Sequence, residues 1–288
     1  MESPTVTLVE SLLLAVIHGF SRFVPVNGEA HEAILNRFLG FPSASPEWIA
    51  TFALGALLAL LLYFIHDWAS IFSSFIQVVL YRKRPMTLDE RLPFFLLLCM
   101  GIPFAVLFSL LRRLHLDSLL GLQLEIQAWL PWSLAGGTLM LFLASRWSKR
   151  TQGLFNLGML DSVLFGAGQA LSWIPGMGGT LGMLGVSQLR NYHLEAATKL
   201  ACLMSLPFVV FEAWGSRDLV LWGQVEPIPG TSWFQWGLAL LASLLAGLFA
   251  LKTLNEQIRQ AGFGKLLAYR IFVLVVIVVG QWTLAGSP

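Results

Sequence analysis

Six long apolar segments dominate the sequence and restrict what it can fold into. They cover roughly residues 47–66, 91–111, 126–145, 195–215, 232–252 and 266–285. A helix of about 20 mostly apolar residues crosses the hydrocarbon core of a membrane, so each segment is predicted to be a transmembrane helix. Charged residues make up only 12% of the chain, against about 25% of a soluble domain. The sequence therefore predicts an all-α polytopic membrane protein. It excludes a soluble enzyme, a disordered chain and a nucleic-acid-binding protein.

The basic residues indicate how these helices face. Lysine and arginine gather on the cytoplasmic side of membrane proteins, and six spans would place the loops 67–90, 146–194 and 253–265 on one side. With the flanking helix ends, this side holds 13 of the 18 basic residues. They are Arg82, Lys83, Arg84, Arg91, Arg146, Lys149, Arg150, Arg190, Lys199, Lys252, Arg259, Lys265 and Arg270. The asymmetry predicts an outward-facing N-terminal region. Segment 67–80 is too short to cross alone and is expected to form an interfacial helix or a short hairpin arm.

Two further apolar stretches are interrupted by proline and glycine. Residues 8–39 are broken around Pro25 and Gly28, and residues 155–187 around Pro175 and Gly176. Proline removes a backbone donor and glycine loosens a helix. The freed backbone groups persist at membrane depth only where protein or a wet cavity satisfies them. Both stretches are therefore predicted to be re-entrant helix–loop–helix hairpins.

The two hairpins correspond at an offset of 150 residues, which aligns Pro25 with Pro175 and Gly28 with Gly178. Each hairpin is followed by three predicted spans, so the two hairpins should enter the membrane from opposite sides. We therefore expect one membrane domain over residues 1–288, built as an inverted-topology repeat of about 5–145 and about 155–288. Such a repeat places a binding site where the two broken loops meet, near the membrane midplane.

The first loop concentrates polar side chains within 15 residues of an otherwise apolar region. They are His18, Arg22, Asn27, Glu29, His31 and Glu32. His18 and Arg22 are four residues apart and share a helix face. Arg22, two imidazoles and the amides at the hairpin end predict an anion site, for which phosphate is the natural ligand. In the alternative, Arg22 pairs with Glu29 and the histidines bond to backbone carbonyls.

The second loop carries no charge between Asp161 and Arg190. Its candidate residues are Gln169, Ser172, Gly176, Gly178, Gly179 and Thr180. The glycine amides are predicted to face an anionic headgroup, as the amides of an anion-binding nest do. Alternatively, the glycines let two helices pack closely, and the polar side chains are satisfied within the bundle.

The remaining polar residues favour structural roles. Asp161 is expected to cap a helix, Glu195 and Lys199 to form an i, i+4 surface pair, and Glu212 to lie near the membrane interface. No spacing of histidine or cysteine predicts a metal site.

Four segments together resemble the bacterial undecaprenyl-diphosphate phosphatases, also called bacitracin-resistance proteins. HGFSRFVPVNGEAH is similar to that family's E-G-x-T-E-F-L-P-V-S-S-x-G-H, and GQALSWIPGMGGTLG to its G-x-x-Q-x-x-A-x-x-P-G-x-S-R-S-G. LEAATKLACLMSLP and AYRIFVLVVI resemble two later motifs. The resemblance covers nearly the whole chain. It implies six spans, two opposed hairpins, a site open to the periplasm and residence in the bacterial cytoplasmic membrane.

The family removes the terminal phosphate from a C55 lipid diphosphate. It uses two glutamates, a histidine, hydroxyl groups, one arginine and a divalent cation. At the matching positions, the two glutamates are replaced by His18 and Arg22, and the histidine is kept as His31. The Ser-Arg-Ser positions hold Gly178, Gly179 and Thr180, so the family's arginine is absent. Losing cooperating catalytic groups costs orders of magnitude in rate.

Three hypotheses follow. In the first, the chain binds a polyprenyl phosphate or diphosphate, hydrolyses it poorly, and presents or moves the lipid carrier in cell-wall recycling. In the second, it is an active phosphatase with a rebuilt site, in which His31 is nucleophile or acid/base, Glu29 is the base and Arg22 holds phosphate; a divalent cation is expected only here. In the third, it transports an anion or small solute. The sequence indicates no oligomeric state.

Overall fold

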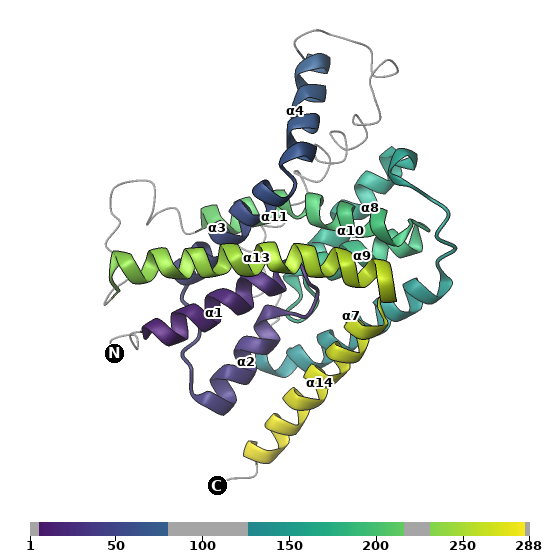
Figure 1. Ribbon diagram of the computed structural model, residues 1–288. Helices are drawn as coiled ribbons and strands as arrows, with labels where there is room; N and C mark the ends of the chain where they lie inside the picture. Colours follow the sequence, from purple (N-terminus) through teal and green to yellow (C-terminus); the bar gives the residue numbers. More distant parts are fainter. Residues whose placement is uncertain (1–5, 80–125, 216–230, 286–288) are drawn as a thin grey trace, which may run out of the picture.

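The computed structural model describes residues 6–79, 126–215 and 231–285 (Figure 1). These residues are helical apart from turns and one isolated bridge between Gln152 and Tyr192. The predicted span 91–111 lies outside the described residues, as do the basic residues between 82 and 113 and Arg217. The all-α prediction is confirmed for the described part of the chain.

The α-helices agree closely with the predicted segments. They are α1 (Leu8–Ser21), α2 (Gly28–Leu39), α3 (Pro46–Tyr63), α4 (Ile65–Val79), α7 (Ile126–Trp147), α8 (Met159–Ala170), α9 (Gly179–Leu189), α10 (Leu194–Met204), α11 (Leu206–Gly215), α13 (Trp233–Ala261) and α14 (Gly264–Ala285). Two short 3₁₀ turns, η2 (Leu154–Asn156) and η3 (Leu171–Trp173), flank α8. The predicted span 195–215 is divided between α10 and α11 next to Pro207, which cannot continue the backbone ladder.

Three helices in the described part of the chain are long and apolar enough to cross a membrane: Pro46–Tyr63, Trp233–Ala261 and Gly264–Gln281. They match three of the six predicted spans. Helix α7 coincides with a fourth predicted segment, 126–145. These helices agree with a membrane protein, and the count of six spans stays a prediction.

Both interrupted stretches are helical hairpins. The arms of the first are α1 and α2, and those of the second are α8 with η3 and then α9. Each second arm begins after a residue of positive φ, Asn27 (70°) and Gly178 (74°). These two residues are 151 positions apart and the prolines 150, so the second turn holds one more residue. Entry of the hairpins from opposite sides of a membrane stays a prediction.

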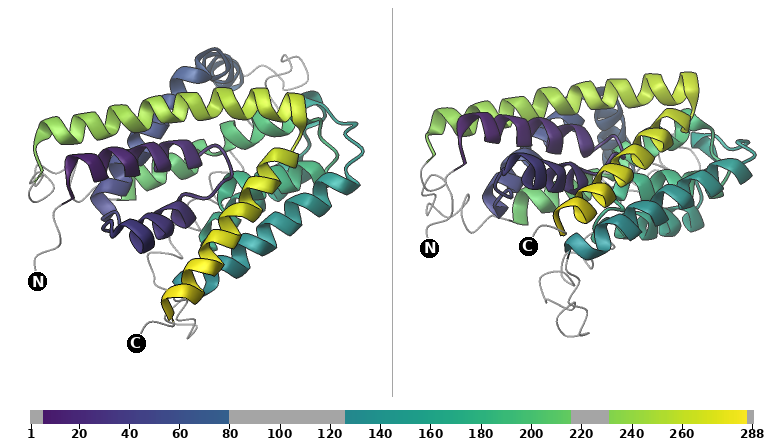
Figure 2. Two further views of the ribbon diagram at one scale, coloured as in Figure 1. Left: turned by 60° about the horizontal axis from the view of Figure 1, so that its bottom comes forward. Right: turned by 90° about the horizontal axis from the view of Figure 1, so that it is seen from below.

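The last helix of each predicted repeat packs against the hairpin of the other. Helix α7 contacts α9, and α14 contacts α2. Figure 2 shows α14 running alongside α7 in both views. Helix α13 lies against α1 and α3. Helix α4, which includes most of the predicted interfacial segment, extends away from the other helices (Figure 1). The crossed packing brings the two hairpin turns together.

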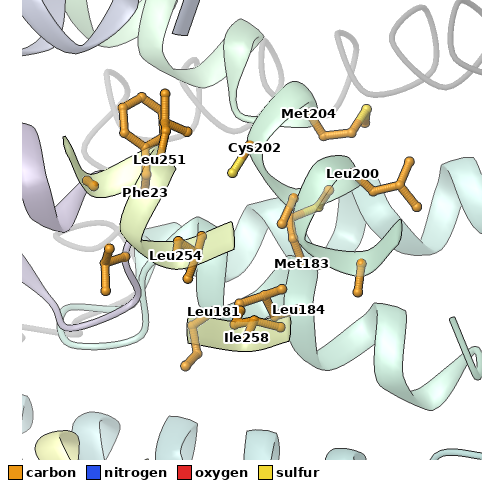
Figure 3. Close-up of a cluster of buried hydrophobic side chains, with 14 of the residues drawn as sticks. Phe23, Leu181, Met183, Leu184, Leu200, Cys202, Met204, Leu251, Leu254 and Ile258 are labelled. Atoms are coloured by element: carbon orange, nitrogen blue, oxygen red, sulfur yellow. The ribbon is translucent and has the colours of Figure 1, made fainter. Parts of the chain in front are cut away.

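The main apolar core lies beside these turns (Figure 3). Phe23 of the first turn is fully buried and belongs to the same cluster as Leu184 of α9, Leu200 of α10 and Leu251 of α13. Burying a side chain of this size contributes about 1.5–3 kcal/mol. The core therefore anchors the first turn to helices of the second half of the chain.

Candidate functional site

Two hydrogen bonds join the hairpin turns directly. The Thr180 hydroxyl, at the start of α9, donates to the carbonyl of Arg22 over 2.8 Å. The backbone N–H of Gly176 donates to the Glu29 carboxylate over 3.0 Å. Helices α2 and α9 therefore both begin where the turns meet, and their positive dipole ends favour an anion there. We call the contact between residues 22–29 and residues 176–180 the hairpin junction.

Arg270 of α14 holds the hairpin junction together. Its side chain is fully buried. Its guanidinium donates to the carbonyl of Pro25 (2.8 Å) in the first turn and to that of Gly176 (3.2 Å) in the second. It also bonds to the Thr138 hydroxyl and the Leu134 carbonyl of α7. Arg270 is thus not a charge of the basic membrane face, as its place in the sequence suggested.

Arg22 pairs with Glu212 of α11. The Arg22 guanidinium also lies over the ring of Phe208, 5.7 Å from its centroid. The two side chains of the ion pair are only 16% and 19% exposed, so water screens their attraction less than at a surface. The buried Nε of Arg22 has no hydrogen-bond partner in the described structure.

His18 is also held by a carboxylate. Its Nε2 lies 3.0 Å from Glu32 of α2, whose other carboxylate oxygen accepts from the backbone N–H of Ala44 over 2.7 Å. The imidazole stacks on Phe52 of α3 with a centroid distance of 5.3 Å. The pair ties the two arms of the first hairpin together and fixes the imidazole.

His31 is bonded at both ring nitrogens. Nδ1 lies 2.6 Å from the carbonyl of Asn27, and Nε2 lies 2.7 Å from the hydroxyl of Tyr269. A carbonyl can only accept, so Nδ1 carries the hydrogen and a neutral His31 accepts from Tyr269 at Nε2. The Asn27 side chain accepts from the N–H of Ala30 and caps α2. The prediction that a histidine bonds to a backbone carbonyl holds for His31.

The second turn contains polar side-chain atoms that have no hydrogen-bond partner among the described residues. Gln169 is 5% exposed, and its Oε1 has no partner among the described residues. The buried hydroxyl oxygen of Ser172 is likewise without one. Both side chains lie beside Gly179, since a Cβ added there would be 3.2 Å from Gln169 Nε2. Burying such groups unpaired costs roughly 1–3 kcal/mol each.

The comparisons with known proteins agree on one family. The model of the family described as bacitracin resistance protein BacA matches residues 11–278. The chain belongs to this family. An undecaprenyl-diphosphatase from an Anaeromyxobacter strain is 27% identical over 288 residues, covering 96% of this chain and 88% of that protein. Its counterpart in Micrococcus luteus is 31% identical over 206 residues, covering 70% and 72%. Undecaprenyl-diphosphatase 1 of Corynebacterium jeikeium is 27% identical, covering 99% of this chain and 100% of that protein.

The BacA-family resemblance implies a divalent cation, and the donors at the hairpin junction do not fit one. Magnesium and calcium bind carboxylate and carbonyl oxygens, whereas the two family glutamate positions hold His18 and Arg22. The Glu32 oxygens already accept from His18 and Ala44. Within the described ranges, no three His, Cys, Asp or Glu side chains group as metal ligands. We therefore derive no chemical step through a metal ion.

The other charged residues differ in part from expectation. Asp161 accepts from the N–H of Gly158 and caps α8, as predicted. It also pairs with Arg190, which raises the pKa of that guanidinium. Lys199 pairs with Asp67 of α4 over 2.6 Å, and not with Glu195. These ion pairs join α8 to the end of α9 and α10 to α4, and they lie apart from the hairpin junction.

Sequence reasoning missed Glu212, Tyr269 and Arg270 as residues of the site. Glu212 was assigned to the membrane interface, and only packing brings it to Arg22, 190 positions earlier. Arg270 did carry a signal, because it stands in an apolar helix beside Tyr269 within the family's Y-R-I motif. An ionisable residue inside a spanning segment is a functional candidate by default.

Proposed function

We propose that this BacA-family protein binds the phosphate or diphosphate headgroup of a polyprenyl lipid carrier at the hairpin junction and hydrolyses it poorly. Its role is then to present the carrier or move it across the bacterial cytoplasmic membrane, with the site open to the periplasm. The relatives are named undecaprenyl-diphosphatases, which supports this lipid as the ligand.

One observation is the main support for the proposal that hydrolysis is poor. The two positions where the family has glutamates hold His18 and Arg22, and both side chains are engaged with carboxylates of this chain. Neither replacement supplies a free carboxylate, which is the group suited to act as a general base. His31 remains, but its Nε2 is bonded to Tyr269. The chain thus lacks an available base at these three positions.

Retention of an anion site rests on the basic groups of the hairpin junction. Arg22 offers an unused Nε, and Ser172 an unused hydroxyl. Arg270 adds a buried positive charge that donates to carbonyl and hydroxyl oxygens. A phosphate group suits such donors because charge-assisted hydrogen bonds are roughly twice as strong as neutral ones.

A second candidate, an active phosphatase with a rebuilt site, is favoured by His31. This is the one catalytic residue of the family that the first turn retains, and two hydrogen bonds orient its ring. In this alternative His31 Nε2 leaves Tyr269 to act on the phosphate, and Glu29, in the first turn of α2, is the base.

Binding is tested with purified protein in lipid nanodiscs and undecaprenyl phosphate as the probe. We expect saturable binding that weakens roughly tenfold or more in Arg22→Gln, because a charged hydrogen-bond donor contributes about 1.5–3 kcal/mol. Arg146→Gln is the matched control, since Arg146 is exposed in the last turn of α7. Equal affinities of wild type and Arg22→Gln would contradict the proposal.

Movement of the carrier is tested in liposomes by following the accessibility of the lipid headgroup from outside. Protein-dependent exchange between leaflets, lost in Arg22→Gln, supports a transport role. Tight lipid binding without exchange between leaflets would support a role in presenting the carrier instead of transporting it. Uptake of inorganic phosphate without any lipid binding would replace the proposal with the small-anion transporter.

A further inference from the structure

A cavity of about 530 Å³ lies between the end of α3, the start of α10 and the last turns of α13. We call it the α10–α13 cavity. Its volume suits a small ligand or the headgroup of a lipid. Two of its lining residues, Cys202 and Leu251, belong to the buried core cluster that also contains Phe23 (Figure 3). None of the described residues that line it belongs to the hairpin junction, so it is a separate site.

The α10–α13 cavity is apolar at one end and charged at the other. Leu251, Asn255 and Arg259 all line it, and their spacing of four residues places them along one face of α13. Leu251 is buried in the core, whereas Asn255 and Arg259 are exposed. On α10, Cys202 is buried and Glu195, two turns earlier, is exposed. An amphiphilic ligand with its polar group at the mouth fits this gradient.

The packing of α3 against α13 indicates the level of the cavity in the membrane. Near the starts of these helices, Trp236 Nε1 donates to the Thr51 hydroxyl over 2.8 Å. Nearer their ends, a Cβ added to Gly247 would lie 2.8 Å from that of Ala59. The two helices therefore run in parallel and end on the same side, which their flanking loops predict to be cytoplasmic. Because α3 ends at Tyr63, which lines the cavity, we expect the cavity at the headgroup level of this side.

The mouth of the cavity carries both signs of charge. Lys199 and Arg259 contribute cations, and Glu195 contributes a carboxylate. The ends of the two helices are in contact, because a Cβ added to Gly262, directly after α13, would lie 3.8 Å from Leu194 at the start of α10. Arg259 is three residues before this contact, and Glu195 is one residue after it. A ligand with a negative and a positive group can therefore engage both helices within one cavity.

We propose that the α10–α13 cavity binds a zwitterionic phospholipid whose headgroup carries an amine on its phosphodiester. Arg259 is the main ligand of the phosphate, because Lys199 is already paired with Asp67 over 2.6 Å. Glu195 binds the amine, and the apolar end of the cavity receives the first part of the acyl chains. Charge-assisted hydrogen bonds favour both headgroup contacts, and basic pockets between spanning helices suit lipid headgroups. This lipid site is independent of the ligand proposed for the hairpin junction.

The test titrates the full-length protein in detergent with single phospholipids and measures each affinity by native mass spectrometry. Phosphatidylethanolamine should bind roughly twofold to fivefold more tightly than phosphatidylglycerol, as expected for one partly screened contact between a carboxylate and an amine. Glu195→Gln should abolish this preference, because it removes the charge that distinguishes the two headgroups. Arg259→Gln should weaken both lipids roughly threefold to tenfold, because both carry the phosphodiester.

Two exposed residues outside the cavity lining provide matched controls for the loss of charge. They are Glu256 on α13 and Lys265 at the start of α14. Glu256→Gln should keep the preference between the lipids, and Lys265→Gln should keep both affinities. Equal affinity of wild type for the two lipids, or a preference that survives Glu195→Gln, overturns the inference. Free phosphoethanolamine that binds as tightly as the lipid also overturns it, because the ligand would then be a soluble solute.

Discussion

The two hairpin turns share a backbone design and differ in chemistry. Each contains a proline, and each second arm begins after a residue of positive φ. In each, the last helix of the other predicted repeat donates a side-chain hydrogen bond to the proline carbonyl, from Ser133 to Pro175 and from Arg270 to Pro25. Yet one donor is a neutral hydroxyl and the other a buried cation. The turn geometry therefore does not require charge.

Replacing the two donors should give the clearest contrast. Arg270→Met removes hydrogen bonds to three carbonyls and a hydroxyl, and we expect it to lower the free energy of unfolding by about 3–5 kcal/mol. Ser133→Ala should cost about 1 kcal/mol. Thermal unfolding of the purified variants in one detergent measures both. Equal losses of unfolding free energy in the two variants would show that the two hydrogen-bond donors stabilise their turns equally.

Two glycines of the second turn allow a finer comparison. Gly176 has a φ of 88°, and an added Cβ would collide with the Ser133 hydroxyl. Gly178 has a φ of 74°, but no atom lies within 4 Å of its added Cβ. We expect Gly176→Ala to cost about 2–4 kcal/mol and Gly178→Ala about 1 kcal/mol, since only the first adds overlap to backbone strain. The midpoints of thermal unfolding check the order, and a larger effect at Gly178 would contradict the turn geometry.

The smallest effect concerns the direct link between the turns. Thr180→Val keeps the shape of the side chain and removes its hydrogen bond to the Arg22 carbonyl. The expected loss is about 1 kcal/mol of unfolding free energy. Thr198→Val is the control, because the Thr198 hydroxyl bonds only within α10. If both variants lose the same amount, the link between the turns adds nothing beyond a local hydrogen bond.

Local structure was largely predictable from the sequence. Proline and glycine in apolar stretches located both hairpins, because their effect on a helix is a property of single residues. The approximate bounds of α3 and α14, and the start of α13, followed from apolar length, whereas α13 continues to Ala261 beyond the predicted apolar segment. Pro25 and Pro175 also pointed to corresponding turns, although the extra residue in the second turn shifts the cap from the expected offset.

The partners of the charged residues were not predictable in this way. Local spacing suggested Glu195 as the partner of Lys199, but the packed helices supply Asp67, and they bring Glu212 to Arg22 from 190 positions away. Such choices depend on contacts between distant elements, which sequence spacing does not report. Arg270 was misassigned for a related reason, since counting basic residues by loop treats each as exposed.

Phosphate release from undecaprenyl diphosphate tests the central claim most directly. We predict that purified wild-type protein, with or without magnesium or calcium, releases phosphate at the rate of a His31→Ala variant. A His18→Glu, Arg22→Glu, Gly179→Arg variant, which restores family residues at three positions, is the companion measurement. Its turnover should rise above wild type if the loss lies in these residues. Wild-type turnover well above background that His31→Ala abolishes would contradict the account and establish the rebuilt phosphatase.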